Sequence, residues 1–230
     1  MLDPIHARRP RFVAYPPAVK LIITSCLVVF GMQGIVPGVL ESVFALWPVG
    51  GPEWVRTPLG WMRVPSFEIW QLITYSLLHG GLAHIFFNLF ALWMFGAQVE
   101  NVWGSRRFLV YYLVCVAGAG LVQLVVVSLS VASGEPPIPT VGASGGVFGV
   151  LLAFAWMFPE ARIMLLIPPI PLKAKVFVPL YAAVELYFGV TGTQSGVAHF
   201  AHLGGLAFGG LLIQYWRGRL PWRPGRTFYW

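Results

Sequence analysis

Apolar residues along the chain gather in six long runs, which are separated by segments rich in proline, glycine and charged residues. A helix needs roughly 20 residues to cross about 30 Å of hydrocarbon. The first, second, third and sixth runs meet or nearly meet this length, whereas the fourth and fifth are shorter. The pattern predicts an all-α polytopic membrane protein with six transmembrane helices. The runs cover residues 18–36, 82–99, 107–131, 144–158, 176–190 and 198–216.

A long connection, residues 37–81, joins the first two runs. After Pro37 it holds four further prolines, four tryptophans and three glutamates. The prolines exclude a continuous helix, while the tryptophans and aliphatic residues favour a folded element in the membrane interface. The stretch Trp70–Leu78 is apolar enough to imitate a span, but Gly80 and Gly81 interrupt it. We therefore expect a long membrane-interface loop between helices 1 and 2.

The composition narrows the class of protein. Hydrophobic residues make up 57% of the 230 residues and charged residues 10%, against roughly 45–50% and 25% in soluble domains. A soluble globule, a disordered chain, a collagen, a coiled coil and a secreted disulfide scaffold are all excluded. Cys26 and Cys115 lie inside apolar runs, so we interpret both as packing residues.

The positive charges indicate the orientation of the spans. Thirteen of the fifteen Lys and Arg lie in the N-terminal part as far as Lys20, after the last run, or in the second and fourth connections, counted to Arg107 and Lys175, whereas Arg56 and Arg63 fall on the other side. The positive-inside rule then places both termini in the cytoplasm. We expect a basic cytoplasmic segment at 1–17, a membrane domain at 18–216 and a basic cytoplasmic tail at 217–230. The net charge of +7 is interpreted as a topology signal and not as a nucleic-acid-binding surface, and we expect no cleavable signal peptide.

Four polar side chains interrupt the apolar runs near the predicted outer surface. His84 and Asn88 are four residues apart and share one helix face. Ser144 begins the fourth run, and His202 lies in the sixth. Such groups cost free energy inside an apolar bundle, so their presence indicates function. Because the second, fourth and sixth runs cross in the same direction, we expect these groups to lie at one depth.

Small residues predict close packing between the fourth and sixth runs. Gly145 and Gly149 are spaced four apart in the fourth run, and the sixth carries a stripe made of Ala198, Ala201, Gly205 and Gly209. Such stripes let helix backbones approach in lipid. If the two stripes face each other, Ser144 comes within hydrogen-bonding reach of His202. Taken alone, the glycines favour simple helix packing without chemistry.

A serine beside a histidine is the smallest activated nucleophile, because the imidazole takes the hydroxyl proton and later returns it to the leaving group. Asp3 is the single aspartate of the chain and falls on the predicted cytoplasmic side. Glu185, in the fifth run, has no evident route to His202. We therefore expect a Ser144–His202 dyad and not a triad.

An oxyanion in such a reaction needs donors that are aimed at the developing charge. Asn88, His84 and the backbone N–H of Ser144 are candidates, and Ser144 stands at a helix N-terminus, whose dipole favours an anion. The fourth run has fifteen residues from Ser144 to Phe158, which is about 22 Å against a hydrocarbon core of about 30 Å. We expect its outer end to lie below the membrane surface in a cavity that is wetted from outside.

Three short motifs occur in a specific order along the chain. They are His84-x-x-x-Asn88 in the second run, GASGG at 142–146 in the fourth and AHLGG at 201–205 in the sixth. The set resembles the rhomboid family of intramembrane serine proteases, and the resemblance runs from about Trp70 to Gln214.

The resemblance implies Ser144 as the nucleophile and His202 as its base, with His84, Asn88 and Gly142 as oxyanion or structural supports. It implies a serine endopeptidase without a cofactor or a metal. Its implied partners are the lipid bilayer and single-span membrane-protein substrates, with no nucleic acid. The expected location is a bacterial inner membrane, with the site open to the outer side.

The chain departs from the family pattern at two positions. Gln71 follows Trp70 where the family often has an arginine, which concerns the polar anchoring of the long loop. Phe148 stands four residues after Ser144, where some members carry a tyrosine that packs against the histidine. A phenylalanine can also pack against an imidazole.

Two other interpretations stay open. A haem- or metal-binding membrane protein that uses His84 and His202 explains the histidines but leaves Ser144 and its neighbouring glycines unexplained. A catalytically inactive relative that binds membrane clients is the second. Of the other histidines, we expect His79 to lie in a loop and His199 to pack or hydrogen-bond near the site.

The fifth run is the expected entry point for substrates. It is short, it is interpreted as bounded by Pro179 and Gly189, and it continues into a loop at 189–197 rich in Gly, Thr and Ser. We therefore expect a substrate segment to pass beside this run on its way to the site.

Overall fold

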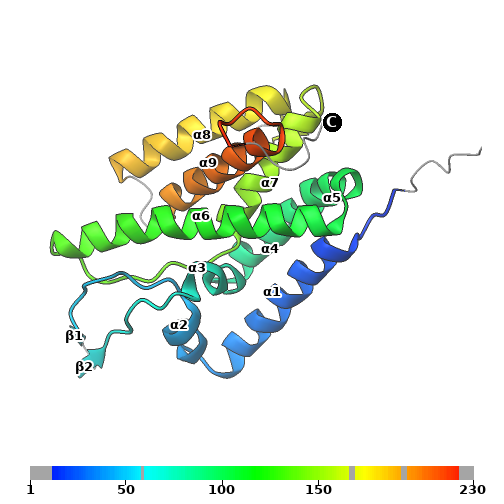
Figure 1. Ribbon diagram of the computed structural model, residues 1–230. Coiled ribbons are helices and arrows are strands. Elements are labelled where there is room, and N and C mark those ends of the chain that lie inside the picture. Colours follow the sequence, from blue (N-terminus) through cyan, green and yellow to red (C-terminus); the bar gives the residue numbers. More distant parts are fainter. Residues whose placement is uncertain (1–11, 58–59, 166–168, 193–195, 223–230) are drawn as a thin grey trace, which may run out of the picture.

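The computed structural model describes residues 12–57, 60–165, 169–192 and 196–222, which form packed helices and two small antiparallel strand pairs (Figure 1). Each of the six apolar runs lies on a helix. The elements are, in chain order, α1 (Pro17–Ile35), α2 (Val39–Phe44), β1 (Trp54–Thr57), β2 (Gly60–Arg63), α3 (Gln71–Thr74), η1 (Tyr75–Leu77), α4 (Leu82–Ala91), η2 (Leu92–Gly96), α5 (Ala97–Trp103), α6 (Ser105–Ala132), α7 (Ser144–Met157), β3 (Arg162–Met164), β4 (Pro171–Lys173), α8 (Ala174–Thr191) and α9 (His199–Trp216).

Several of these helices have the length and apolarity of membrane spans. In the described part of the chain, four meet both criteria: α1, the continuous rod α4–η2–α5 at Leu82–Trp103, α6 and α8. Helix α7 is apolar but has only 14 residues. Helix α9 has 18 residues, as many as α8, but is not among the four helices that meet both criteria. The predicted all-α polytopic membrane fold is confirmed, and the count of six spans stays a prediction.

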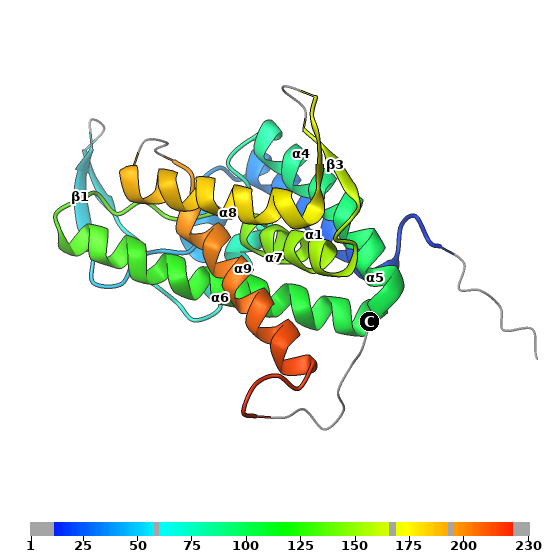
Figure 2. The same cartoon turned by 90° about the horizontal axis from the view of Figure 1, so that it is seen from above.

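Helix α7 forms the centre of the molecule. It packs against α6, α8, α9 and the α4–η2–α5 rod, and ten of its fourteen residues are buried. Helix α6 (green in Figure 1) runs across the molecule, with α8 and α9 on one side and α1 and α3 on the other. Seen from above, α9 crosses α6 while α8 extends along α7 (Figure 2). The polar end of α7 is therefore enclosed by several helices.

Glycines let α6, α7 and α9 approach very closely. A Cβ placed on Gly205 of α9 would lie 1.8 Å from the Gly145 carbonyl oxygen of α7, and a Cβ on Gly149 would lie 2.3 Å from Cys115 Sγ of α6. The predicted stripes of small residues therefore face each other. Cys26 and Cys115 are buried free thiols, in agreement with their interpretation as packing residues.

A buried carboxylate ties the start of α1 to α5. Glu100 is 2% exposed, and its two oxygens accept the backbone N–H groups of Ala18 and Val19, each at 2.8 Å. N–H groups in the first turn of a helix have no partner within that helix. The carboxylate therefore caps α1 and lies at the positive end of its dipole.

The long connection between α1 and α4 is folded, as predicted. Gln71 is buried, its Oε1 accepts the Trp47 N–H at 3.2 Å, and its Nε2 donates to the Val43 carbonyl at 3.2 Å. Gln71 therefore anchors the loop by its amide, without the arginine that the resemblance would place there. Reciprocal backbone hydrogen bonds of 3.0 and 2.9 Å between Leu46 and Thr140 join this connection to the segment before α7.

The predicted fifth run at 176–190 lies on α8, but the expectation that Pro179 and Gly189 bound it is wrong. Pro179 and Gly189 both lie inside α8, which spans Ala174–Thr191. Pro179 lacks the N–H that would bond to the carbonyl four residues earlier, and membrane helices tolerate this loss where neighbouring groups satisfy the backbone. Of the expected loop at 189–197, residues 193–195 lie outside the described residues.

Several charged residues of the orientation argument also lie outside the described residues. They are Asp3 and the terminal arginines Arg8, Arg9, Arg11, Arg223 and Arg226. The segments predicted at 1–17 and 217–230, and the cytoplasmic placement of both ends, stay predictions.

The contact between α7 and α9 predicts a sharp difference between two glycines of α9. We expect Gly205→Ala to lower the free energy of unfolding by about 1–3 kcal/mol or more, because its Cβ overlaps the Gly145 carbonyl and the helices must separate. Gly210→Ala is the matched control, because its Cβ would meet only Leu152 Cδ2 at an ordinary 3.5 Å. Unfolding in detergent micelles measures both, and equal losses would contradict the packing argument.

Candidate active site

Ser144 is the first residue of α7 and is half-buried. The turn before it depends on Gly142, which has φ +125°, a conformation that L side chains rarely adopt. The Gly142 N–H donates to the Tyr75 carbonyl at 2.9 Å, and the Tyr75 hydroxyl donates to the Val116 carbonyl at 2.9 Å. The serine is therefore placed by a turn that is hydrogen-bonded to η1 and indirectly to α6.

His202 lies on the turn of α9 that faces the start of α7. The ring of Phe148, one turn after Ser144, stacks on the imidazole with a centroid distance of 4.2 Å and an interplanar angle of 7°. A Cβ on Gly145 would lie 3.4 Å from the Ala201 carbonyl oxygen, so the backbones next to Ser144 and His202 are in contact. The structure thus brings the two predicted residues onto adjacent turns, and Phe148 packs as expected.

His84 approaches the same turn from α4. A Cβ on Gly142 would lie 2.7 Å from His84 Cε1 and Nε2, and 3.8 Å from Ser144 Oγ. His84 Nδ1 accepts the Gly80 N–H at 3.2 Å, so a neutral His84 carries its proton on Nε2. That N–H is located beside the serine turn, where a donor to an oxyanion is needed.

Asn88 lies one turn below His84 and is buried, at 7% exposure. Its Nδ2 donates to the His84 carbonyl at 2.9 Å. The predicted shared face of His84 and Asn88 is present, and the hydrogen bond of the Asn88 amide is made within its own helix. Its role as an oxyanion donor stays a prediction.

Glu185 corrects the expected isolation of the histidine. Its Oε2 lies 2.8 Å from His202 Nδ1 and 2.6 Å from His199 Nδ1, and all three side chains are buried. The expectation that Glu185 has no route to His202 is therefore wrong. Helices α8 and α9 pack against each other, so residues 14 and 17 positions apart in the chain meet in the bundle. The signal in the sequence was an acid and two histidines on consecutive apolar runs.

His79 lies in the loop before α4, as predicted, and packs edge-on against His84 with ring centroids 5.2 Å apart. Burial lowers the pKa of His79 from 6.5 to about 4, and the neighbouring His84 ring adds to this effect. His79 is therefore uncharged at neutral pH and supports His84 by packing. His199, expected to pack or hydrogen-bond near the site, does so through Glu185.

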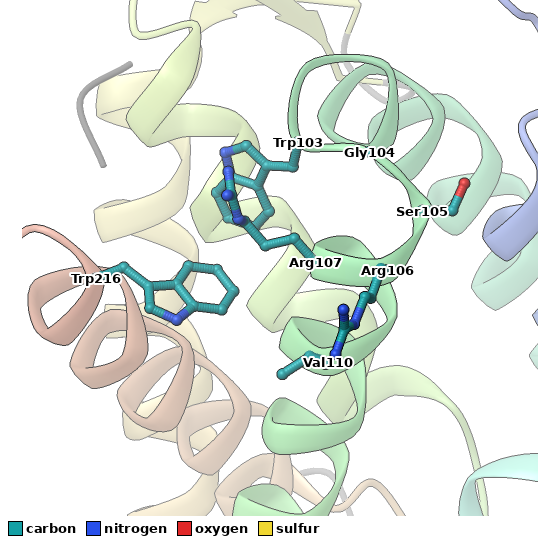
Figure 3. Close-up of a pocket in the computed structure, with 7 residues that line it drawn as sticks. All are labelled: Trp103, Gly104, Ser105, Arg106, Arg107, Val110 and Trp216. Carbon is teal, nitrogen blue, oxygen red and sulfur yellow. The ribbon is translucent and has the colours of Figure 1, made fainter. Parts of the chain in front are cut away.

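Two cavities lie at different distances from the candidate site residues. A cavity of about 440 Å³ lies at the start of α6 and the end of α9. Ser144 is at the start of α7 and His202 is near the start of α9, and neither residue lines this cavity. In this cavity the Arg107 guanidinium lies over the Trp216 ring, 5.9 Å from its centroid. Figure 3 shows its lining, which consists of Trp103, Gly104, Ser105, Arg106, Arg107, Val110 and Trp216.

A second cavity, of about 200 Å³, borders the cluster formed by Glu185, His199 and His202, through His199. It lies where the end of α8 meets the start of α9 and includes His199 in its wall. Its lining consists of Gln123, Val126, Phe188, Gly189, Gly192, Gly196, Val197, Ala198, His199 and Phe200. Of these two cavities, the one that includes His199 therefore lies nearer the candidate site, where α8 is followed by α9.

Comparison with known proteins gives a consistent set of relatives. The family model described as "Rhomboid domain" matches residues 66–219. Rhomboid protease GluP of Bacillus subtilis (strain 168) is 32% identical over 142 residues, which cover 62% of this chain and 25% of that protein. Rhomboid protease GlpG of Pectobacterium atrosepticum is 32% identical over 183 residues, which cover 76% and 58%.

A mitochondrial protein is also similar. Presenilin-associated rhomboid-like protein, mitochondrial, of Homo sapiens is 28% identical over 212 residues, which cover 85% of this chain and 54% of that protein. The matches therefore span from a quarter to somewhat over half of the length of these three relatives.

The position of His84 predicts the effect of a methyl group on the serine turn. We expect Gly142→Ala to lower the free energy of unfolding by about 1–3 kcal/mol more than Gly134→Ala. Both glycines have positive φ, +125° at Gly142 and +97° at Gly134. A Cβ on Gly142 would lie 2.7 Å from the His84 ring, whereas a Cβ on Gly134 would have no atom within 4 Å. Unfolding in detergent measures the difference, which His84→Ala should remove. An equal cost at both glycines would refute the contact.

Proposed function

The chain belongs to the rhomboid family, and from that premise we propose that it is an intramembrane serine endopeptidase. The observation that carries the proposal is the meeting of three helices at one turn. Ser144 begins α7, the His202 ring of α9 is stacked on Phe148 of the same α7, and His84 of α4 lies against Gly142. These are the parts that nucleophilic acyl transfer requires: a nucleophile, a base and a donor for the oxyanion.

In the proposed mechanism, Ser144 Oγ attacks the carbonyl carbon of a substrate peptide bond while His202 Nε2 takes the hydroxyl proton. The resulting oxyanion is stabilised by the backbone N–H of Ser144 and by the Nε2–H of His84, with Asn88 and Gly142 as supports. The intermediate collapses when His202 returns the proton to the leaving amine. Water then hydrolyses the acyl-enzyme, with His202 again as base.

The proposed substrates are membrane proteins with a single span, cut in or near that span within the bilayer. The proposed domain is residues 18–216, with six spans and both flanking basic segments in the cytoplasm. The distribution of Lys and Arg supports this orientation, and the site then opens to the outer side of a bacterial inner membrane. The short helix α7 supports a serine that lies below the membrane surface.

Cleavage of a single-span reporter tests the proposal. In detergent or liposomes, we expect Ser144→Ala and His202→Ala each to lower kcat by at least about 10³-fold, because each removes one half of the acyl-transfer pair. Ser133→Ala is the matched control, since Ser133 Oγ is exposed and bonds the Leu129 carbonyl of α6. Activity should be unaffected by a chelator.

The outcomes separate the alternatives. Cleavage that survives Ser144→Ala contradicts the mechanism. A folded wild type that captures the reporter without cutting it favours the inactive client-binding interpretation, and a Soret band or bound metal favours the haem or metal interpretation.

The packing of α8 supports it as the helix beside which a substrate enters. It packs chiefly on α9 and α7, and it exposes large apolar residues along its length: Val176, Leu180, Val184, Leu186, Tyr187 and Val190. A helix with few buried contacts is more easily displaced than one at the centre.

A reversible cross-link tests this entry route. With Cys26 and Cys115 replaced by alanine, we expect a disulfide between α7 and α8, which pack against each other, to lower cleavage of a transmembrane substrate at least about tenfold, because α8 can no longer move away from α7. Reductant should restore cleavage, and the same two cysteines kept reduced are the control. Unchanged cleavage in the cross-linked protein would exclude this route.

A further inference from the structure

We propose that Glu185 is a positioning residue for His202, so that the site contains a serine, a histidine and a carboxylate in series. This inference rests on the proposed protease function. It replaces the dyad that the sequence predicted with a triad in which α8 supplies the carboxylate.

The carboxylate determines which nitrogen of His202 carries the proton. An ionised carboxylate only accepts hydrogen bonds, so the 2.8 Å contact requires His202 Nδ1–H to donate to Glu185 Oε2. The neutral ring then keeps its lone pair on Nε2, the atom that must receive the proton of Ser144. Without the carboxylate, nothing among the described contacts of His202 would select this tautomer.

Two contacts fix the ring in different directions. Glu185 holds His202 in its plane through Nδ1, and Phe148 covers its face at 4.2 Å. The first contact comes from α8 and the second from α7. A hydrogen bond in the ring plane and a stacked face together restrict both rotation and tilt, which is the geometry that proton transfer requires.

His199 makes the buried carboxylate tolerable. A buried charge costs several kcal/mol unless it is hydrogen-bonded, and His199 Nδ1 supplies a second bond to Oε2 at 2.6 Å. His199 Nε2 is buried without a hydrogen-bond partner among the described residues, in keeping with a neutral ring whose single proton is on Nδ1. Two imidazole donors therefore share one carboxylate oxygen.

The arrangement acts most strongly during the reaction. When His202 takes the proton of Ser144 it becomes an imidazolium, and a carboxylate at 2.8 Å in a site of low dielectric stabilises that charge. The other groups near the ring are Tyr181 on α8, which contacts Phe148, His84 on α4 and His199 on α9 itself. None of these three groups is an acid, so Glu185 is the carboxylate among the described neighbours of the ring.

The same three side chains could also be ligands of a divalent cation, since their donor atoms lie within 4.8 Å of one another. Two ligands of a tetrahedral zinc ion, bound at about 2.05 Å, are about 3.3 Å apart. The distances of 2.6 and 2.8 Å are instead those of charge-assisted hydrogen bonds. The geometry therefore favours hydrogen bonds between Glu185 and the two histidines over coordination of a metal ion.

Substitution of the carboxylate tests the proposal through kinetics. We expect Glu185→Gln to lower kcat for the reporter by about 10²–10⁴-fold with KM changed less than about threefold, because an amide neither selects the tautomer nor stabilises the imidazolium. Glu185→Asp should recover part of the loss. Glu160→Gln is the matched control, because Glu160 is exposed and pairs with Lys173 and Lys175 away from the site. A kcat for Glu185→Gln within threefold of wild type overturns the proposal and leaves the protease function intact.

A spectroscopic readout covers the case of an inactive or unstable protein. In ¹⁵N NMR of the wild type labelled at histidine, we expect His202 to carry its proton on Nδ1, with its resonances assigned by loss in His202→Ala. A proton on Nε2 overturns the proposal even if no cleavage is found. Recovery of activity or a change of the His202 signals on addition of a chelator would show a bound metal in the cluster and would also overturn it. Cleavage of the reporter that is unaffected by Ser144→Ala refutes the serine-protease function instead.

Discussion

The contact of α7 with α9 at Gly145 and Gly205 is the constraint on which the rest of the molecule depends. Lipid is as apolar as leucine, so the hydrophobic effect does not drive one membrane helix onto another, and close packing of surfaces must do so. Here a carbonyl oxygen occupies the place where a Cβ would be. The approach places Ser144 and His202 on adjacent turns and allows Phe148 to reach the imidazole. A larger residue at this crossing would separate the helices and the site together.

Buried polar groups join parts of the chain that the apolar packing alone would leave independent. Glu100 connects α5 to α1, Gln71 connects α3 to α2 and to the loop after it, and Glu185 connects α8 to α9. The hydrogen bonds are made by both oxygens of Glu100, by the amide of Gln71 and by Oε2 of Glu185, as a polar group in a low-dielectric interior requires. These interactions specify which segments meet, and the apolar contacts supply most of the packed surface.

The sequence predicted those features that depend on local pattern. Apolar runs located the long helices, small residues located the close crossing, and His84, Ser144 and His202 were recognised as polar groups at one depth. Glu185 was missed because its partners depend on how α8 and α9 are rotated against each other, which no spacing within one helix reveals. The β1–β2 pair and α2 were foreseen only as a folded loop, because tryptophans and prolines there follow no period. Pro179 suggests a boundary in the sequence but lies inside α8, since its cost to a helix depends on neighbours that the sequence does not show.

The carboxylate that holds His202 is carried by the helix proposed to admit the substrate. Any displacement of α8 away from α9 lengthens the 2.8 Å contact and leaves the base without its orienting partner. Under the proposed function, admission and reaction would then exclude each other in time, because His202 is held in its reactive orientation only when α8 is packed on α9. A membrane protein that passes the displaced α8 without remaining would meet Ser144 while His202 lacks its contact with Glu185. Selectivity would in this way arise from dwell time as well as from recognition of side chains.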